Sequence, residues 1–261
     1  MPIFAPFSYL ANPIVPPVPE WDPSQFTNAQ FWWRADLGVT ESAGNVSAWE
    51  DQINGFTMIQ GTGANQPNLT TSSNLNNQSV IRTNGTSEYM YTSSAPASRT
   101  NDFTMLGVFR INTTNNGGAL MGVAALASTP RVWIDTIGGN IRMYNQSFGQ
   151  VAGLATNILT SGVVGEHAIK LRYDSSAGDF FSAVDTLSET GRGTTGNTGQ
   201  DFGTSTTMPF GALCGQTGAV FLGRYVGMDM AEQVMVYGTP TTDEMNDWKT
   251  YVNNRYGTII S

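Results

Sequence analysis

The fold is decided most clearly by residues 131–146, which read RVWIDTIGGNIRMYNQ. Two runs of alternating side chains, RVWIDT and IRMYNQ, flank the segment IGGN. Alternation with period two is typical of strands, and glycine accepts the positive φ angles of a tight hairpin turn. The stretch therefore predicts an antiparallel β-hairpin. One face of this hairpin carries four apolar side chains that we expect in the core: Val132, Ile134, Ile141 and Met143.

Strand patterns continue on both sides of this hairpin. Residues 103–111 and 167–173 alternate in the same way, and shorter apolar runs occupy residues 180–185, 208–213, 220–225 and 230–237. The chain holds 29 glycines, and only 12% of its residues are charged. This composition favours short strands and tight turns over helices. We predict an all-β fold of antiparallel strands.

The segment after residue 240 has a different period. Thr241 and Glu244 have the spacing of a helix capping box, and Gly257 follows the last position of the pattern. Apolar side chains recur between them at helical spacing: Met245, Trp248, Val252 and Tyr256. We predict a C-terminal amphipathic helix that packs this stripe against the sheets.

Residues 1–26 differ from the rest of the chain because they are rich in proline. Proline fixes φ and removes a backbone donor, so this segment cannot join the interior of a sheet. We predict an extended N-terminal arm at residues 1–26 and one domain at residues 27–261. Docking on a neighbouring molecule and folding back on its own domain are equally open. We expect the arm to be anchored by its apolar side chains: Ile3, Phe4, Phe7, Tyr9, Leu10, Ile14 and Val15.

Two stretches carry a resemblance to a known family. Residues 29–92 contain FWWRA, VSAWEDQ, NQPNL and a strand ending in RTNGTSEY, and residues 220–257 contain AEQVMVY followed by the predicted helix. This order resembles the concanavalin A-like lectin/glucanase superfamily, in its laminin-G-like form, over roughly residues 29–257. The resemblance implies a jelly roll of two antiparallel sheets. It also implies a domain of the kind found in tailed-bacteriophage virion proteins, where function must be argued from the site.

The sequence argues against an enzyme. Glycosidases of this superfamily carry a Glu-x-Asp-x-Glu strand, and no such motif is present. Regular alternation would place Asp229 and Glu232 on opposite faces of a strand, and we expect Glu232 to bond a turn. The single histidine, His167, shares the apolar face of its strand, so we expect it to be a hydrogen-bonded structural residue.

No cofactor is expected. One histidine and one cysteine do not make a zinc site. Calcium is the alternative that laminin-G-like domains suggest, but no dense series of acidic residues supports it, and solvated turn carboxylates are the favoured interpretation. The available carboxylates are Asp174, Asp179, Asp185 and Asp201.

A glycan-binding patch is predicted on the outer face of the hairpin. A sugar stacks on an aromatic ring while its hydroxyls bond polar side chains. Trp133 and Asp135 on one strand, with Arg142 and Tyr144 on the other, lie opposite the four core residues. The alternative is that these side chains cover one another or face a second copy of the chain.

Charge and composition limit the partners. A net charge of −8 without clustered Lys or Arg excludes a basic nucleic-acid face. The apolar N-terminus lacks the basic start of a signal peptide, and no stretch is long enough to insert in a membrane. We therefore expect a non-enzymatic virion structural protein on the head or tail surface, made in the host cytoplasm. Its expected partners are other virion proteins, further copies of itself in a homo-oligomer, and polysaccharide. The alternative function is a glycan-binding host adhesin, and a glycosidase is disfavoured.

Overall fold

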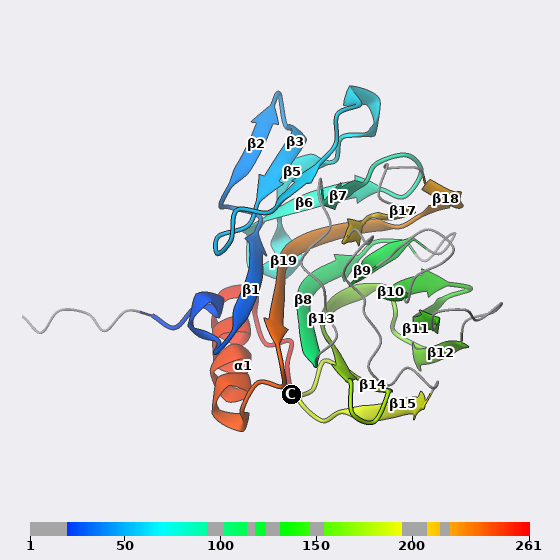
Figure 1. Ribbon diagram of the computed structural model, residues 1–261. Coiled ribbons are helices and arrows are strands. Elements are labelled where there is room, and N and C mark those ends of the chain that lie inside the picture. The colour runs from blue at the N-terminus through cyan, green and yellow to red at the C-terminus, as the bar shows by residue number, and fades with distance from the viewer. Residues whose placement is uncertain are drawn as a thin grey trace, which may run out of the picture.

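The computed structural model describes residues 20–92, 102–113, 118–123, 131–146, 154–194, 208–214 and 220–261. These residues form an antiparallel β-sandwich with one C-terminal helix, as predicted (Figure 1). The strands are β1 Ala29–Arg34, β2 Val39–Ser42, β3 Asn45–Glu50, β4 Thr57–Ile59, β5 Asn68–Ser72, β6 Gln78–Asn84, β7 Met90–Thr92, β8 Phe103–Ile111, β9 Ala119–Val123, β10 Arg131–Ile137, β11 Asn140–Gln146, β12 Leu154–Leu159, β13 Gly165–Asp174, β14 Asp179–Val184, β15 Thr190–Thr194, β16 Pro209–Phe210, β17 Ala212–Cys214, β18 Val220–Tyr225 and β19 Gly227–Tyr237. Helix α1 spans Thr242–Tyr256, and short 3-10 turns occupy Pro23–Gln25, Gly63–Asn65 and Ser73–Leu75.

The largest sheet is built around β19. Its strand order is β15-β14-β13-β8-β19-β6-β5-β3-β4-β7-β16, with β1 paired to β19 and β2 paired to β3. Strand β19 pairs with β8, β6 and β1, all antiparallel. Every residue of β19 except Tyr237 is buried, because both faces of this central strand are covered.

A second, four-stranded sheet has the order β12-β11-β10-β9. Strands β10 and β11 are the predicted hairpin, in which Ile137 pairs with Asn140. Gly138 and Gly139 form its two-residue turn with φ angles of 58° and 78°, the conformation for which glycine is suited. Val132, Ile134, Ile141 and Met143 are fully buried in the core between the sheets, as predicted.

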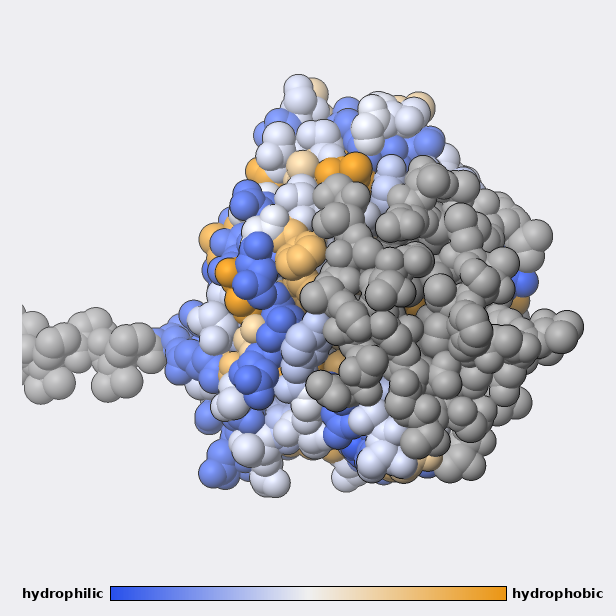
Figure 2. Space-filling view, in the orientation of Figure 1, coloured by the Kyte–Doolittle hydropathy of each residue, from blue (hydrophilic) through white to orange (hydrophobic). Residues whose placement is uncertain are grey.

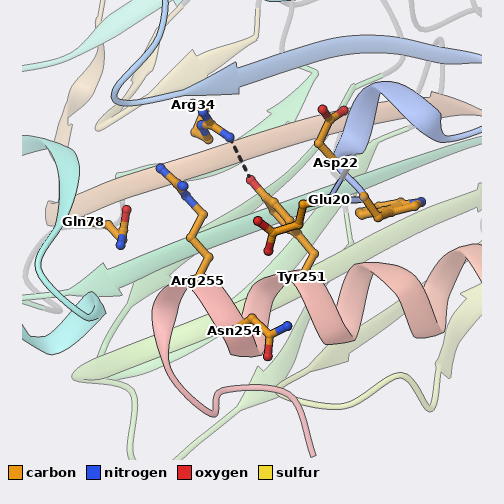
Figure 3. Close-up of a pocket in the computed structure, with 8 residues that line it drawn as sticks. Glu20, Asp22, Arg34, Gln78, Tyr251, Asn254 and Arg255 are labelled. Carbon is orange, nitrogen blue, oxygen red and sulfur yellow. Dashed lines mark hydrogen bonds between the residues drawn. The ribbon is translucent and has the colours of Figure 1, made fainter. Parts of the chain in front are cut away.

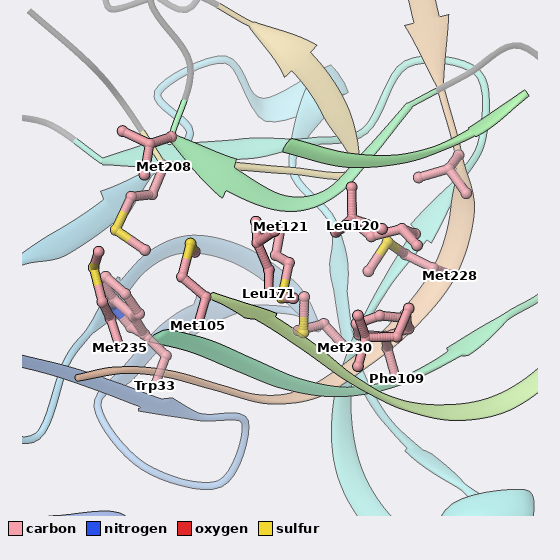
Figure 4. Packing of buried hydrophobic residues seen from close by; sticks show 14 of the residues in the cluster. Trp33, Met105, Phe109, Leu120, Met121, Leu171, Met208, Met228, Met230 and Met235 are labelled. Atoms are coloured by element: carbon pink, nitrogen blue, oxygen red, sulfur yellow. The ribbon is translucent and has the colours of Figure 1, made fainter. Parts of the chain in front are cut away.

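Methionine fills much of this sandwich core. Nine of the 11 methionines belong to it: Met58, Met90, Met105, Met121, Met143, Met208, Met228, Met230 and Met235. Figure 4 labels several of them beside Trp33, Phe109 and Leu171 between the sheets: Met105, Met121, Met208, Met228, Met230 and Met235. Unbranched, flexible thioethers fill irregular gaps, which suits a core between two twisted sheets.

Helix α1 covers the outer face of the large sheet and closes a second core, here called the helix core. Met245, Trp248, Val252 and Tyr256 pack there against Trp32 and the outward side chains of β8 and β19. The predicted capping box is present, with the Thr241 hydroxyl accepting from the Glu244 amide and the Glu244 carboxylate accepting from Thr241. None of the helices in the described parts of the chain has the length and hydrophobicity that crossing a bilayer requires.

Residues 20–26, here called the arm root, lie against this helix. The Trp21 ring meets Tyr251 edge-on at 5.7 Å, and Phe26 lies 6.3 Å from Trp248. The Glu244 carboxylate accepts a bond of 2.6 Å from the Thr27 amide, which ties the end of the arm root to α1. The arm root thus folds on its own domain. The predicted anchoring side chains Ile3, Phe4, Phe7, Tyr9, Leu10, Ile14 and Val15 lie outside the described residues.

Candidate functional site

The four residues of the predicted glycan patch come together on the outer face of the β10–β11 hairpin. The hairpin register places Trp133 opposite Tyr144 and Asp135 opposite Arg142. The Trp133 and Tyr144 rings stack with centroids 4.2 Å apart and planes at 19°. Arg142 donates two bonds to the Asp135 carboxylate, at 2.6 and 2.8 Å, and the Trp133 indole donates a third at 2.9 Å. We call this group the hairpin cluster.

Burial divides the hairpin cluster into an inner and an outer half. Trp133 is 3% exposed and Asp135 is fully buried, whereas Arg142 and Tyr144 are partly exposed. The hydrogen bond to Asp135 raises the pKa of the Arg142 guanidinium, so this guanidinium stays charged at all ordinary pH values. The side chains of the inner half are therefore engaged with one another, and Tyr144 and Arg142 are the two members of the hairpin cluster that reach the surface.

A fully buried carboxylate, Glu232, lies beneath helix α1. It accepts hydrogen bonds from the Trp32 indole and from the hydroxyls of Tyr251 and Tyr256, at 3.0 Å for Tyr251 and 2.5 Å for Tyr256. Burial raises the pKa of Glu232 to about 7, although these hydrogen bonds act in the opposite direction. The expectation that Glu232 bonds a turn is wrong, because its partners are side chains of β1 and α1.

The neighbourhood of Glu232 also departs from regular alternation. The pairing of β19 with β8 shifts register between Met230 and Glu232, the mark of a β-bulge. As a result Asp229 and Glu232 lie on the same outer face, contrary to the expectation from spacing. They serve different partners there, since Asp229 accepts two bonds from Arg82 at 2.6 and 2.9 Å.

A polar pocket of about 360 Å³ opens between the arm root and the C-terminal half of α1 (Figure 3). We call it the helix-edge pocket. Arg34 of β1 reaches it and donates to the Tyr251 hydroxyl at 3.4 Å, which links the pocket to Glu232. Its lining residues are Glu20, Trp21, Asp22, Arg34, Gln78, Tyr251, Asn254 and Arg255.

The sequence did not indicate this pocket. Its lining comes from the arm root, β1, β6 and α1, which are distant in sequence and meet only through the fold. Arg34 and Arg255 look like isolated surface charges in the sequence. The one available signal was Glu20-Trp21-Asp22, an acidic and aromatic group at the end of the proline-rich segment.

His167 has the structural role that was predicted. It is 4% exposed, with Nδ1 2.8 Å from an Asp185 carboxylate oxygen and Nε2 3.2 Å from the Val163 carbonyl. Burial opposes protonation, but the contacts with Asp185 and with the backbone carbonyl of Val163 together outweigh it and raise the pKa of the imidazole. The carboxylate of Asp185 is therefore committed to His167 and to the Ala168 amide.

The remaining carboxylates named for calcium are also engaged or not described. Asp174 accepts from the Ser176 and Ala177 amides in its turn, and Asp179 bonds its neighbour Phe180, while Asp201 lies outside the described residues. Within the described ranges, His, Cys, Asp and Glu side chains form no group of three that could hold a metal ion. The expectation that no cofactor is needed stays a prediction.

Comparison with known proteins bears on the fold. Neither a protein-family model nor a curated protein sequence matches this chain. Among solved structures, botulinum neurotoxin type C, described for its interaction with two ganglioside molecules, is similar over 86% of this chain with a TM-score of 0.57 and 8% identity. An arabinofuranosidase complexed with arabinofuranosyl-xylobiose is similar over 82% of this chain, with a TM-score of 0.54 and 11% identity. Trypanosoma rangeli sialidase is similar over 87%, with a TM-score of 0.53 and 13% identity.

This chain spans 51% of the neurotoxin and arabinofuranosidase chains and 33% of the sialidase chain. The TM-scores support a shared fold, whereas identities this low leave the chemistry to be argued from residues. The chain therefore shares a β-sandwich fold with these structures, which is consistent with the predicted jelly roll.

Proposed function

We propose that this protein is a non-enzymatic structural protein of a tailed-phage virion, which docks on the head or tail through its N-terminal arm and displays a lectin-like sandwich. The comparisons support a fold suited to surface recognition and do not bear on the virion. The proposal rests instead on how the arm root and the sandwich are arranged.

One observation carries the proposal: the arm root and the hairpin cluster lie on opposite sides of the molecule. In Figure 1 the arm root and α1 are at the left, and β10, β11 and β12 are at the right. A protein held by its arm would turn the four-stranded sheet away from the surface that holds it. This is the geometry that a displayed domain requires.

The described surface of the sandwich gives a second reason to assign docking to the arm. Val164, at 54% exposure, is the one large hydrophobic side chain that is exposed among the described residues. The coloured part of the face in Figure 2 is correspondingly mainly polar, with scattered hydrophobic patches. Stable interfaces need a buried apolar centre, and the apolar residues of the arm are the source that the sequence offers.

The test is to remove the arm without disturbing the arm root. Deleting residues 1–19 keeps Trp21 and Phe26 on helix α1, so we expect a folded domain that no longer joins phage particles during assembly. A second variant keeps the arm length but replaces Phe4, Phe7 and Ile14 with Ser. It should also abolish incorporation, which would assign docking to the apolar side chains and not to the length of the arm. Incorporation at the wild-type level by both variants would reject the proposal.

A glycan-binding adhesin is the second candidate, and the exposed half of the hairpin cluster favours it. Tyr144 offers an aromatic ring beside the Arg142 guanidinium, a pairing that suits a sugar. Among the structures with a similar fold, the neurotoxin is described as interacting with two ganglioside molecules and the arabinofuranosidase as complexed with arabinofuranosyl-xylobiose. On a glycan array we expect Tyr144→Ala to lose binding that Asn157→Ala, a change at an exposed neighbour on β12, retains. Equal binding by both variants would exclude the hairpin cluster as the site.

The absence of catalysis is part of the same proposal. Glu232 has the raised pKa of a general acid, yet it is sealed between Trp32, Tyr251 and Tyr256, where a substrate does not reach it. We expect no hydrolysis of aryl glycosides or polysaccharides by the purified protein. Turnover that disappears in Glu232→Gln would contradict this.

A further inference from the structure

We propose that the helix-edge pocket binds a saccharide unit that carries a carboxylate. The site is separate from the hairpin cluster and does not depend on where the protein is carried. Its volume of about 360 Å³ falls in the range of small-molecule pockets. Its lining presents the hydrogen-bonding groups that such a ligand needs.

The positive side of the pocket has unused donors. Arg34 donates through Nε to Asp36 and through Nη1 to Tyr251. Arg255 donates through Nε to Tyr256 and through Nη2 to Asp36. Within the described residues, Arg34 Nη2 and Arg255 Nη1 therefore keep N–H groups without an acceptor. Guanidinium N–H groups bind carboxylates through short, charge-assisted bonds.

Asp36 shows that these two arginines converge on one carboxylate. Its two oxygens accept from Arg34 at 2.6 Å and from Arg255 at 2.7 Å. Two guanidiniums against one carboxylate leave one positive charge at this side of the pocket. A ligand carboxylate can pair with this charge and with the unused N–H groups, while the carboxylates of Glu20 and Asp22 in the same lining oppose any second negative charge, such as that of a phosphate.

The rest of the lining suits hydroxyl groups. Glu20 and Asp22 belong to the same lining (Figure 3), where their carboxylate oxygens can accept from hydroxyls. Gln78 and Asn254 supply amides that both donate and accept. Trp21 adds an aromatic ring at the arm root. Acidic, amide and aromatic groups around an arginine pair match an acidic sugar better than an apolar ligand.

The binding test uses trigalacturonate as the probe and its methyl ester as the matched neutral ligand, measured by titration calorimetry on the full chain. We expect trigalacturonate to bind and the ester to bind at least about tenfold more weakly, since the ester loses the charge-assisted bonds. Equal binding of acid and ester would overturn the proposal, and so would the failure of both to bind.

Variants then locate the site. Arg255→Gln should weaken trigalacturonate binding about tenfold or more, while Lys249→Gln, which removes the same charge from the same helix, should leave it unchanged. Asn254→Trp adds bulk at an exposed position and should block the pocket without removing a structural bond. Equal losses in Arg255→Gln and Lys249→Gln, or full binding by Asn254→Trp, would refute the assignment. A loss in Tyr144→Ala alone would move the site to the hairpin cluster and equally refute it.

Discussion

Glu232 combines full burial with three aromatic donors, and that combination decides how it responds to pH. Burial raises its pKa to about 7 from an ordinary value of 4.5. The folded protein therefore keeps a proton on this carboxyl where the unfolded chain has lost it. It follows that the contribution of Glu232 to the free energy of unfolding is complete below about pH 4.5 and is lost as pH rises through about 7.

The variant Glu232→Gln has no carboxyl group that can titrate at this position. A pKa of about 7 in place of 4.5 corresponds to about 3 kcal/mol. Between acid and neutral pH, the unfolding free energy of the wild type should fall by up to about 3 kcal/mol relative to that of the variant. Any difference in stability between the two proteins that does not depend on pH leaves this change unaffected. Urea unfolding at a series of pH values measures the difference, and parallel curves for the two proteins would contradict the buried, protonated carboxyl.

The ion pair of Asp135 and Arg142 should contribute to the stability of the fold as a unit. Asp135 is fully buried, so Asp135→Ala leaves the Arg142 guanidinium without its carboxylate and should cost about 3 kcal/mol of unfolding free energy. Adding Arg142→Ala should cost little more, because the unpaired charge is then gone. A double-mutant cycle by urea unfolding measures the coupling. Strictly additive losses would show that the pair does not act as a unit.

At the scale of elements, the two strongest sequence signals were local ones. The hairpin of β10 and β11 follows from alternation around Gly138-Gly139, and α1 follows from the spacing of Thr241, Glu244 and its apolar stripe. The pairing of Trp133 with Tyr144 was also predictable, because a two-residue turn sets the register of both strands.

What the sequence could not supply depends on contacts between distant elements. Period two places Trp133 on the outer face but does not reveal that it is 3% exposed. The bulge beside Glu232 is a feature of how β19 pairs with β8. The helix-edge pocket exists because the arm root folds on α1, and composition alone left that contact open.

The capping box at the start of α1 should contribute measurably to the stability of the fold. The Thr241 hydroxyl accepts from the Glu244 amide at 3.2 Å. Thr241→Ala removes this acceptor and should lower the free energy of unfolding by about 1 kcal/mol. Thr241→Ser keeps the hydroxyl and should stay within a few tenths of the wild type, on the magnitudes typical of caps. Thermal unfolding of the two variants compares them directly, and equal losses would assign the effect to the methyl group instead.

At the scale of the whole molecule, β19 joins the two cores. Met228, Met230 and Met235 point into the sandwich core, and Val234 and Val236 point into the helix core. Opening either core would expose one face of the strand that supports the other. Because apolar surface buried on both sides is lost together, we expect the sandwich and α1 to unfold as one cooperative unit.

Native-state hydrogen exchange tests this cooperativity. The slowest amides of α1, near Val252, should open with the same free energy as those of β8. Met230→Ala, a change confined to the sandwich core, should cost about 2–5 kcal/mol and lower the protection of both sets of amides equally. Lys249→Ala on the surface of α1 serves as the control and should change neither. If Met230→Ala lowered the protection of β8 but left that of α1 unchanged, the helix would unfold independently of the sandwich core. The stability of the helix-edge pocket would then depend on α1 and not on the sandwich core.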